Sequence, residues 1–306
     1  MTPTIPAIKP RALAAGDEIV LVAPAGPFDP SRFEHGVARL RDWGFRPVWR
    51  GDIFERDGYL AGRDERRLAE LQNALGSDAA CVWCVRGGYG SLRLLDRLDI
   101  TPFVQHPKLL IGFSDITVLA WDLWRRTGIT QLHGPMIAGE QFQIADSTLD
   151  DWYLRLLRDS SAPGIAPLGK CVCVTPGNAT GRLLPGNLTL IVHLVAAGRC
   201  PNLSGAILII EDVGEAPYRV DRMLVTLKLS GVLNAVSGLV FGEFGGVDEA
   251  TIGRLAAETS EALGGVPCVM GARFGHGAQN TALPVGTLAS LDATNGTLEI
   301  TESPVC

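Results

Sequence analysis

Long apolar runs are missing from this sequence. No stretch reaches the ~18 to 20 consecutive apolar residues that a membrane-spanning helix needs, so we expect no membrane contact. The apolar run at residues 19–25 is too short for a secretory signal, and the acidic pair Asp17 and Glu18 directly precedes it. We interpret this run as a buried strand and expect a cytoplasmic protein.

An excess of positive charge is missing too. The 27 Lys and Arg residues stand against 33 Asp and Glu residues, which gives a formal net charge of −6. Such a surface repels phosphate backbones, so we expect no nucleic-acid partner. The sequence also has no cluster of His, Cys or carboxylate residues at metal-ligand spacing, and we predict neither a metal nor a cofactor.

The seven cysteines are few and scattered along the chain. Cys81 and Cys84 form a C-x-x-C pair, but they lie in an apolar strand pattern, where residues three apart face opposite sides. We therefore predict buried free thiols at these positions and no redox motif. Reduced thiols are typical of the cytoplasm.

Strand and helix patterns alternate through the first half of the 306 residues. Continuous apolar runs predict buried parallel strands at residues 19–23, 80–85 and 109–113. Apolar residues at helical spacing predict helices over residues 30–43, 64–75 and 116–126. This order indicates right-handed βαβ units and an α/β fold with an open, mostly parallel sheet flanked by helices.

A change of character near residue 146 predicts a second domain. We expect an N-terminal domain at residues 1–145, a linker at 146–170 and a smaller C-terminal α/β domain with mixed strands at 171–306. The chain is predicted to end in a hairpin around Asn295-Gly296, a pair typical of the type I′ turn.

Two glycine- and serine-containing loops follow predicted strands of the first domain, where ligands of α/β sheets collect. Residues 86–91, R-G-G-Y-G-S, can turn backbone N–H groups outward to accept an anion, although a tight turn explains the glycines equally well. Ser114 stands between a strand and a helix, which displays its hydroxyl beside the free N–H of Asp115. Capping of the helix is the alternative role for this serine.

Two further loops belong to the second domain. Glu211 follows the apolar strand pattern at 206–210 and could orient an imidazole, or it could stabilise the next helix start, as Glu215 could. His276 lies between two glycines, which suits a side chain that approaches a substrate, and His133 at another strand end could line the cleft. Serine, carboxylate and histidine together suggest an activated serine nucleophile.

These loops contain sequence motifs of a known family, and the resemblance extends from about residue 8 to the end in the same order. The sequence resembles the LD-carboxypeptidase family of serine peptidases, peptidase family S66. The motifs that carry it are A-G-D-E-I-V-L-V-A-P-A at 15–25, L-A-G-R-D-E-R-R at 60–67, V-R-G-G-Y-G at 85–90, G-F-S-D-I-T at 112–117, H-G-P-M at 133–136, P-G-N-L-T at 185–189, I-E-D-V-G-E-A-P-Y-R-V-D-R-M-L at 210–224 and G-H-G at 275–277.

The resemblance implies a catalytic triad. Ser114 would be the nucleophile, His276 the base and Glu211 the orienting carboxylate, with Glu215 as the alternative carboxylate. The backbone N–H groups of Gly88 and Asp115 would form the oxyanion hole. We further expect Arg86 and Tyr89 to contact the substrate, although Arg86 could equally form a structural salt bridge.

The resemblance also implies an activity. Members of the family remove the terminal D-alanine of a murein tetrapeptide by cutting an L-D amide bond through an acyl-enzyme, without metal or cofactor, and often as homodimers. Two alternatives stay open: a microcin C self-immunity-type peptidase that cleaves a peptidyl- or aminoacyl-nucleotide amide, and a non-catalytic two-lobe binding protein. Only the last would function without Ser114.

Overall fold

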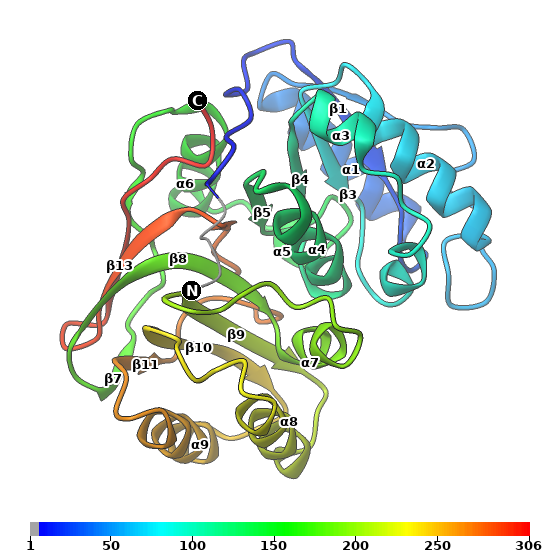
Figure 1. The fold of residues 1–306 in the computed structure, drawn as a ribbon. Coiled ribbons are helices and arrows are strands. Elements are labelled where there is room, and N and C mark those ends of the chain that lie inside the picture. Colours follow the sequence, from blue (N-terminus) through cyan, green and yellow to red (C-terminus); the bar gives the residue numbers. More distant parts are fainter. Residues whose placement is uncertain (1–5) are drawn as a thin grey trace.

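Two β-sheets organise the chain, as Figure 1 shows. The computed structural model describes residues 6–306. The first sheet has six strands in the order β12-β5-β4-β3-β1-β2, and the second has eight in the order β6-β14-β13-β8-β9-β10-β11-β7. The predicted fold class is confirmed, with helices flanking a mostly parallel first sheet and a mixed second one.

The first sheet is parallel except at one edge. Its strands are β1 (Glu18–Val22), β2 (Arg46–Val48), β3 (Cys81–Cys84), β4 (Leu109–Ile111), β5 (Gln131–His133) and the antiparallel β12 (Leu283–Val285). The helices between these strands are α1 (Pro30–Asp42), α2 (Asp64–Gly76), α3 (Thr101–Gln105) and α4 (Thr117–Thr127), with two 3₁₀ turns, η1 (Ser91–Leu94) and η2 (Ser114–Ile116). Strand β12 comes from the last quarter of the chain, which the sequence pattern did not predict.

Strand β3 explains why this sheet is covered on both faces. All four of its residues are buried. Cys81 and Trp83 join the apolar cluster on one side, while Val82 and Cys84 join the cluster on the other. Because side chains alternate along a strand, Cys81 and Cys84 face opposite sides as free, buried thiols, which confirms the prediction.

The second sheet is parallel in its centre and antiparallel at both edges. Its strands are β6 (Gly164–Ile165), β7 (Val172–Thr175), β8 (Asn178–Asn187), β9 (Ile207–Val213), β10 (Gly238–Gly245), β11 (Cys268–Met270), β13 (Leu288–Asp292) and β14 (Thr297–Ile300). Strands β8 to β11 are parallel, and α7 (Leu188–Ala196), α8 (Pro217–Leu229) and α9 (Glu249–Ala262) lie beside them in Figure 1. Helices α5 (Glu140–Gln143) and α6 (Ser147–Arg158) connect the two parts, and the division at 146–170 stays a prediction.

Short polar side chains fix where several helices begin. Asp29, Asp146 and Asp248 accept hydrogen bonds from backbone N–H groups in the first turns of α1, α6 and α9, which would otherwise lack partners. Within residues 6–306, no helix is both long and apolar enough to cross a bilayer.

The terminal hairpin is confirmed, but its predicted turn type is wrong. Asp292 pairs with Thr297, so four residues connect β13 to β14. A type I′ turn needs two successive residues with positive φ, and here Gly296 has φ +69° while Asn295 does not adopt a positive φ. The Asp292 carboxylate instead accepts hydrogen bonds from the backbone and side chain of Asn295.

One contact between the two sheets determines where the candidate site lies. Trp121 of α4 donates to the Pro185 carbonyl at 2.8 Å, and the Asn187 backbone N–H donates to Thr117 Oγ1 at 3.2 Å. A Cβ atom on Gly186 would lie 2.8 Å from Thr117 Cγ2, so this segment needs glycine to reach α4. The end of β8 is thereby held against the helix that follows Ser114.

Replacing Gly36 by alanine should destabilise the fold. A Cβ atom at Gly36 of α1 would lie 2.1 Å from the Ile137 carbonyl oxygen, so the helix would have to move away from rigid backbone. We expect Gly36→Ala to lower the free energy of unfolding by about 1 to 3 kcal/mol, the usual cost of overpacking, measured by urea denaturation. Gly51→Ala is the matched control, because nothing lies within 4 Å of its added methyl group. Equal urea midpoints for the two variants would contradict this close approach.

Candidate active site

Ser114 occupies a strained turn between β4 and α4. Its φ is +61°, and among residues 6–306 it is the one residue other than glycine with a positive φ. A Cβ atom on Gly87 would lie 3.0 Å from Ser114 Cβ, so the glycine-rich loop packs directly against the serine. Backbone strain of this kind is concentrated at functional sites. The sequence pattern had left helix capping open as its role, but no cap hydrogen bond is made there.

The structure brings Ser114, His276 and Glu211 into one hydrogen-bonded chain. Ser114 Oγ lies 3.0 Å from His276 Nε2, and His276 Nδ1 lies 2.7 Å from Glu211 Oε2. Ser114 and His276 are partly exposed, whereas Glu211 is fully buried within β9. The imidazole therefore connects an accessible hydroxyl to a buried carboxylate. The alternative carboxylate, Glu215, lies elsewhere and pairs with Arg219 at 3.5 Å.

Burial and charge shift the pKa values of His276 and Glu211 in opposite directions. Burial alone would lower the pKa of His276, but the hydrogen bond and negative charge of Glu211 outweigh it and raise that pKa above its usual 6.5. Burial raises the pKa of Glu211, and the hydrogen bonds from His276 and Asn187 oppose that rise. An imidazolium at this position is therefore stabilised by Glu211.

Asn187 and Asp212 belong to the same network, although the sequence analysis did not assign them to the site. Asn187 Nδ2 donates to Glu211 Oε1 at 3.1 Å and to Asp212 Oδ1 at 3.3 Å, while its Oδ1 caps α7 at Leu190. The other oxygen of Asp212 accepts from the backbone and hydroxyl of Thr189. Asn187 lies in the P-G-N-L-T motif, and this motif was the only indication in the sequence that Asn187 could belong to the site. Its contact with Glu211 depends on how β8 and β9 pair.

Two backbone N–H groups, one in the glycine-rich loop and one in the serine turn, make no hydrogen bond within residues 6–306. Gly88 is exposed with φ +106°, and neither its N–H nor that of Asp115 donates to an acceptor among residues 6–306. The buried Asp115 carboxylate accepts from the Ser91 backbone at 2.8 Å, which ties the end of this loop to the serine turn. Two unbonded N–H groups next to a serine hydroxyl are suited to an oxyanion.

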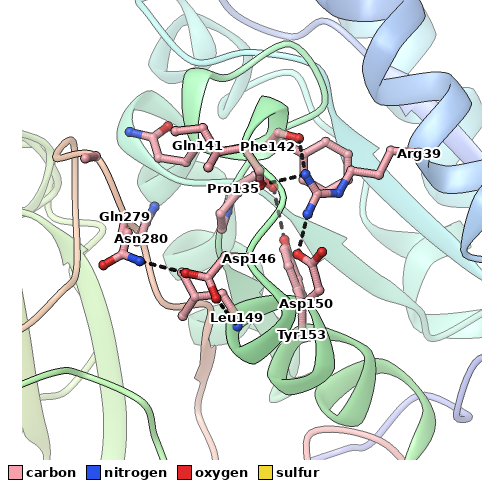
Figure 2. A pocket seen from close by; sticks show the side chains of 12 residues that line it. Arg39, Pro135, Gln141, Phe142, Asp146, Leu149, Asp150, Tyr153, Gln279 and Asn280 are labelled. Carbon is pink, nitrogen blue, oxygen red and sulfur yellow. Dashed lines mark hydrogen bonds and ion pairs between the residues drawn. The ribbon is translucent and has the colours of Figure 1, made fainter.

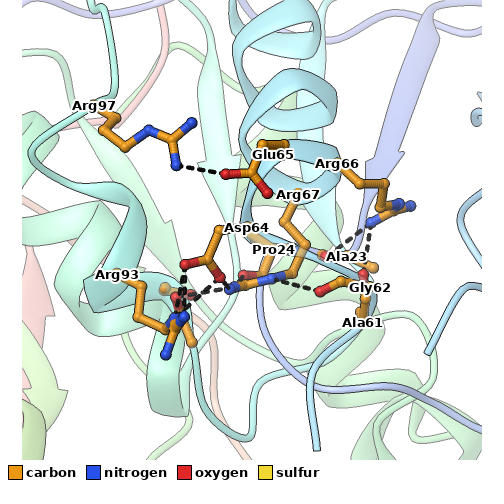
Figure 3. Close-up of polar contacts among 12 residues, drawn as sticks. Ala23, Pro24, Ala61, Gly62, Asp64, Glu65, Arg66, Arg67, Arg93 and Arg97 are labelled. Atoms are coloured by element: carbon orange, nitrogen blue, oxygen red, sulfur yellow. Dashed lines mark hydrogen bonds and ion pairs between the residues drawn. The ribbon is translucent and has the colours of Figure 1, made fainter. Parts of the chain in front are cut away.

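A buried arginine also bonds to this loop, and Figure 3 shows it among its partners Pro24, Gly62 and Asp64. Arg67 of α2 is fully buried and donates to the carbonyls of Pro24, Gly62 and Gly90, the last at 2.9 Å, and to Asp64. A Cβ atom on Gly90 would lie 2.6 Å from this guanidinium. Arg67 of the L-A-G-R-D-E-R-R motif thus fixes the glycine-rich loop at Gly90, although the motif lies more than twenty residues earlier in the sequence.

Arg86 and Tyr89 are both exposed beside Gly88. They line an open depression together with Gly26, Pro27, Tyr59 and Gly88. The rings of Tyr59 and Tyr89 meet edge to face at 5.6 Å, and Arg86 donates to the Pro27 carbonyl. Arg86 forms no salt bridge within the described residues, so the structural ion pair that we considered for it is absent there.

Three side chains hold the loop that carries His276. Asn280 accepts from the Gly275 backbone at 3.1 Å, Gln141 donates to the Gly277 carbonyl at 2.9 Å, and Gln279 donates to Asp146 at 2.7 Å. Figure 2 shows Gln279 and Asp146 joined by this hydrogen bond, and both residues line a small pocket. The His276 loop is thus tied to the segment that contains α5 and α6.

The expectation that His133 lines the cleft is wrong. Its side chain is fully buried between the rings of Phe113 and Phe274, whose centroids lie 5.9 and 4.6 Å from its own. Burial lowers the pKa of His133 to about 3, so it stays neutral. Within residues 6–306, no group of three or more His, Cys, Asp or Glu residues is arranged to hold a metal ion.

Comparison with known proteins identifies the family. The model of the LD-carboxypeptidase N-terminal domain matches residues 19–134, and the model of the LD-carboxypeptidase C-terminal domain matches residues 180–291. This chain belongs to the LD-carboxypeptidase family. Ser114 lies in the first matched region, and Glu211 and His276 lie in the second.

Relatives from other bacteria match nearly the whole chain. A protein of Synechocystis sp. with carboxypeptidase in its name is 38% identical over 95% of this chain and 96% of its own. The murein tetrapeptide carboxypeptidase of Pseudomonas aeruginosa is 32% identical over 90% of this chain and 92% of its own. The microcin C7 self-immunity protein of Escherichia coli is 28% identical over 95% and 94%.

Solved structures of the family share the fold. The muramoyltetrapeptide carboxypeptidase from Oxalobacter formigenes has a TM-score of 0.80 and 30% identity, covering 94% of this chain and 100% of that one. The wild-type microcin C7 self-immunity protein without ligand has a TM-score of 0.88 and 25% identity, covering 98% and 100%. This chain therefore shares its fold with both of these proteins.

Replacing Glu211 by glutamine should lower the pKa of His276. The amide keeps the size of the side chain but removes the charge that raises the histidine pKa, so the lowering effect of burial should dominate. NMR titration of the His276 ring should give a pKa above 6.5 in the wild type and below 6.5 in Glu211→Gln. Glu215→Gln is the control and should leave the titration unchanged. A His276 pKa that does not fall in Glu211→Gln would contradict the coupling.

Proposed function

We propose that this member of the LD-carboxypeptidase family is a serine carboxypeptidase that releases the terminal D-alanine of murein tetrapeptides. The observation that carries the proposal is the hydrogen-bonded chain from Ser114 through His276 to Glu211. The names of the relatives from Pseudomonas aeruginosa and Oxalobacter formigenes support a murein peptide as the substrate.

The first step is attack by the serine on the carbonyl carbon of the L-residue. A serine hydroxyl is a poor nucleophile at neutral pH, so His276 takes its proton through Nε2 while the new C–O bond forms. Glu211 holds the Nδ1 proton, which fixes the tautomer and stabilises the imidazolium. The backbone N–H groups of Gly88 and Asp115 receive the oxyanion, and each such donor contributes about 3 to 4 kcal/mol in comparable hydrolases.

The second step completes the cleavage. His276 returns its proton to the departing nitrogen, and the amide bond breaks. D-alanine leaves, and the rest of the peptide stays bound to Ser114 as an ester, the acyl-enzyme. Water, deprotonated by the same imidazole, then hydrolyses the ester and restores the hydroxyl. These residues carry the complete reaction without a cofactor.

Arg86 and Tyr89 are proposed to contact the substrate. The terminal carboxylate of the peptide calls for a cation near the scissile bond, and Arg86 lies exposed beside Gly88 with no ionic partner in the described residues. Tyr89 forms an exposed aromatic pair with Tyr59 on the same depression. This pair could cover the apolar part of a bound peptide.

A microcin C self-immunity-type peptidase is the second candidate. The high structural similarity to the microcin C7 self-immunity protein favours it, and the Tyr59–Tyr89 pair is an exposed aromatic surface that could stack on a nucleobase. We favour the murein substrate because the sequence has no aromatic insertion after residue 170.

Location, assembly and domain division are further parts of the proposal. All seven cysteines are free, which supports a reducing compartment such as the cytoplasm. Val213, Tyr218, Val225 and Leu229 are large apolar side chains exposed at the end of β9 and on α8, which supports a homodimer. We propose domains at residues 1–145 and 171–306, joined by 146–170, because the matched family regions end and begin on either side of that linker.

Ser114→Ala should abolish the release of D-alanine. Without the hydroxyl no acyl-enzyme can form, so we expect the rate of release from a disaccharide tetrapeptide to fall by about 10⁴-fold or more, measured by mass spectrometry. His276→Ala should match it, since the two act as a unit. Release of an aminoacyl sulfamoyl adenosine product instead of D-alanine would favour the microcin-type enzyme. A binding protein would retain ligand affinity in Ser114→Ala and release nothing in either form.

Asn187→Ser should impair catalysis while preserving the helix cap. Serine can still accept from the Leu190 backbone, but it cannot donate to Glu211 as the asparagine amide does. We expect kcat/KM to fall by about 10-fold, the usual effect of losing a hydrogen bond to a charged group. The acid limb of the pH profile reports the protonation of His276. It should move to higher pH, because Glu211 without the Asn187 donor is a stronger base and stabilises the imidazolium more strongly. An unshifted acid limb would contradict this role of Asn187.

A further inference from the structure

Three carboxylates meet at the carboxyl ends of β9 and β10, and one of them has no partner. Glu211 is bonded to His276 and Asn187, and Asp212 is bonded to Thr189 and Asn187. The side chain of Glu243 makes neither a hydrogen bond nor an ion pair with any residue in 6–306. The carboxylate oxygens of Glu243 are therefore free to accept hydrogen bonds from a bound ligand.

A β-bulge brings Glu243 to the site. The pairing of β9 with β10 shifts between Phe241 and Phe244, so that Gly242 and Glu243 together stand opposite Glu211. Bulges of this kind redirect a side chain and are common beside active sites. The Glu243 backbone N–H donates to the Phe274 carbonyl at 2.9 Å, which fixes its position relative to the His276 loop.

The Glu243 carboxylate lies directly over the residue that follows His276. A Cβ atom on Gly277 would lie 1.2 Å from Glu243 Oε2, so only glycine leaves room for the carboxylate at this point. Glu243 is only partly buried. Burial and the charge of Glu211 raise its pKa, and the positive charge of Arg273, which forms no ion pair with it, opposes that rise. A cation that entered this side of the site would relieve that repulsion.

We infer that Glu243 recognises an ammonium group at the end of the side chain of the L-residue whose carbonyl is attacked, as a diamino acid carries. This inference rests on the proposed function. The side chain of that residue leaves the carbon atom next to the attacked carbonyl, so it must lie beside Ser114 and His276. Its apolar stem ends in an ammonium group, and a partnerless carboxylate one residue from the histidine is the matching acceptor. Glu243 is thus a specificity-determining residue for an amine-bearing side chain.

The experiment compares two tetrapeptides that differ in one group. One has L-lysine as its third residue, and the other has L-norleucine, which keeps the apolar stem but lacks the ammonium group. The wild type should show a kcat/KM for the lysine peptide about 10- to 100-fold higher than for the norleucine peptide, the effect of a hydrogen bond between charged groups, mainly through KM. In Glu243→Gln this ratio should fall to about 1. Glu249→Gln, on the exposed first turn of α9, is the matched control and should keep the wild-type ratio.

Three results would overturn the inference. A wild type that cleaves both peptides equally well does not read the ammonium group. A ratio that survives in Glu243→Gln would assign the preference to another residue, and an equal loss on both peptides in that variant would indicate a merely structural role. If the wild type releases D-alanine from neither peptide, the proposed function itself fails, which is distinct from release without a preference for lysine.

Discussion

The candidate site depends on the contact between α4 and the segment that ends β8. The hydrogen bonds from Trp121 to Pro185 and from Asn187 to Thr117, with Gly186 between them, hold the second sheet against the helix that follows Ser114. Together with the pairing of β12 with β5, this contact keeps Ser114 within hydrogen-bonding distance of His276, which is bonded in turn to Glu211. Because Asn187 also donates to Glu211, one residue connects the serine helix to the buried carboxylate.

The pKa shifts in the site depend on which of its charged groups are buried. Glu211 is buried completely and would be unfavourable as an anion, but His276 and Asn187 each donate a hydrogen bond to it. Its charge then raises the pKa of His276 against the effect of burial. Glu243 lies in the same field and accepts no hydrogen bond from any residue in 6–306; the charge of Glu211 raises its pKa, and the charge of Arg273 opposes that rise.

Glycine allows the close approaches that the site requires. Gly87 lets the glycine-rich loop pack against Ser114. A Cβ atom on Gly275, whose φ is +121°, would lie 2.6 Å from Glu211 Oε2, so glycine is needed where the histidine loop passes the carboxylate. Ser114 itself adopts a positive φ, held by the hydrogen bond from Ser91 to Asp115 and by Arg67 behind the loop. The strain at the serine is thus supported by buried polar contacts from α2 and η1.

The amino-acid sequence by itself determined the elements and the candidate residues, because hydrophobic periodicity and glycine-rich loops are local signals. It predicted the strands around Ile19 and Leu110, the helix after Ser114 and the loop around His276. It could not decide between Glu211 and Glu215, because only the pairing of β8, β9 and β10 turns one of them toward the histidine. The short edge strand β12, the burial of His133, and the contacts of Asn187 and Glu243 were decided by the tertiary structure alone, since each depends on residues far apart in the chain.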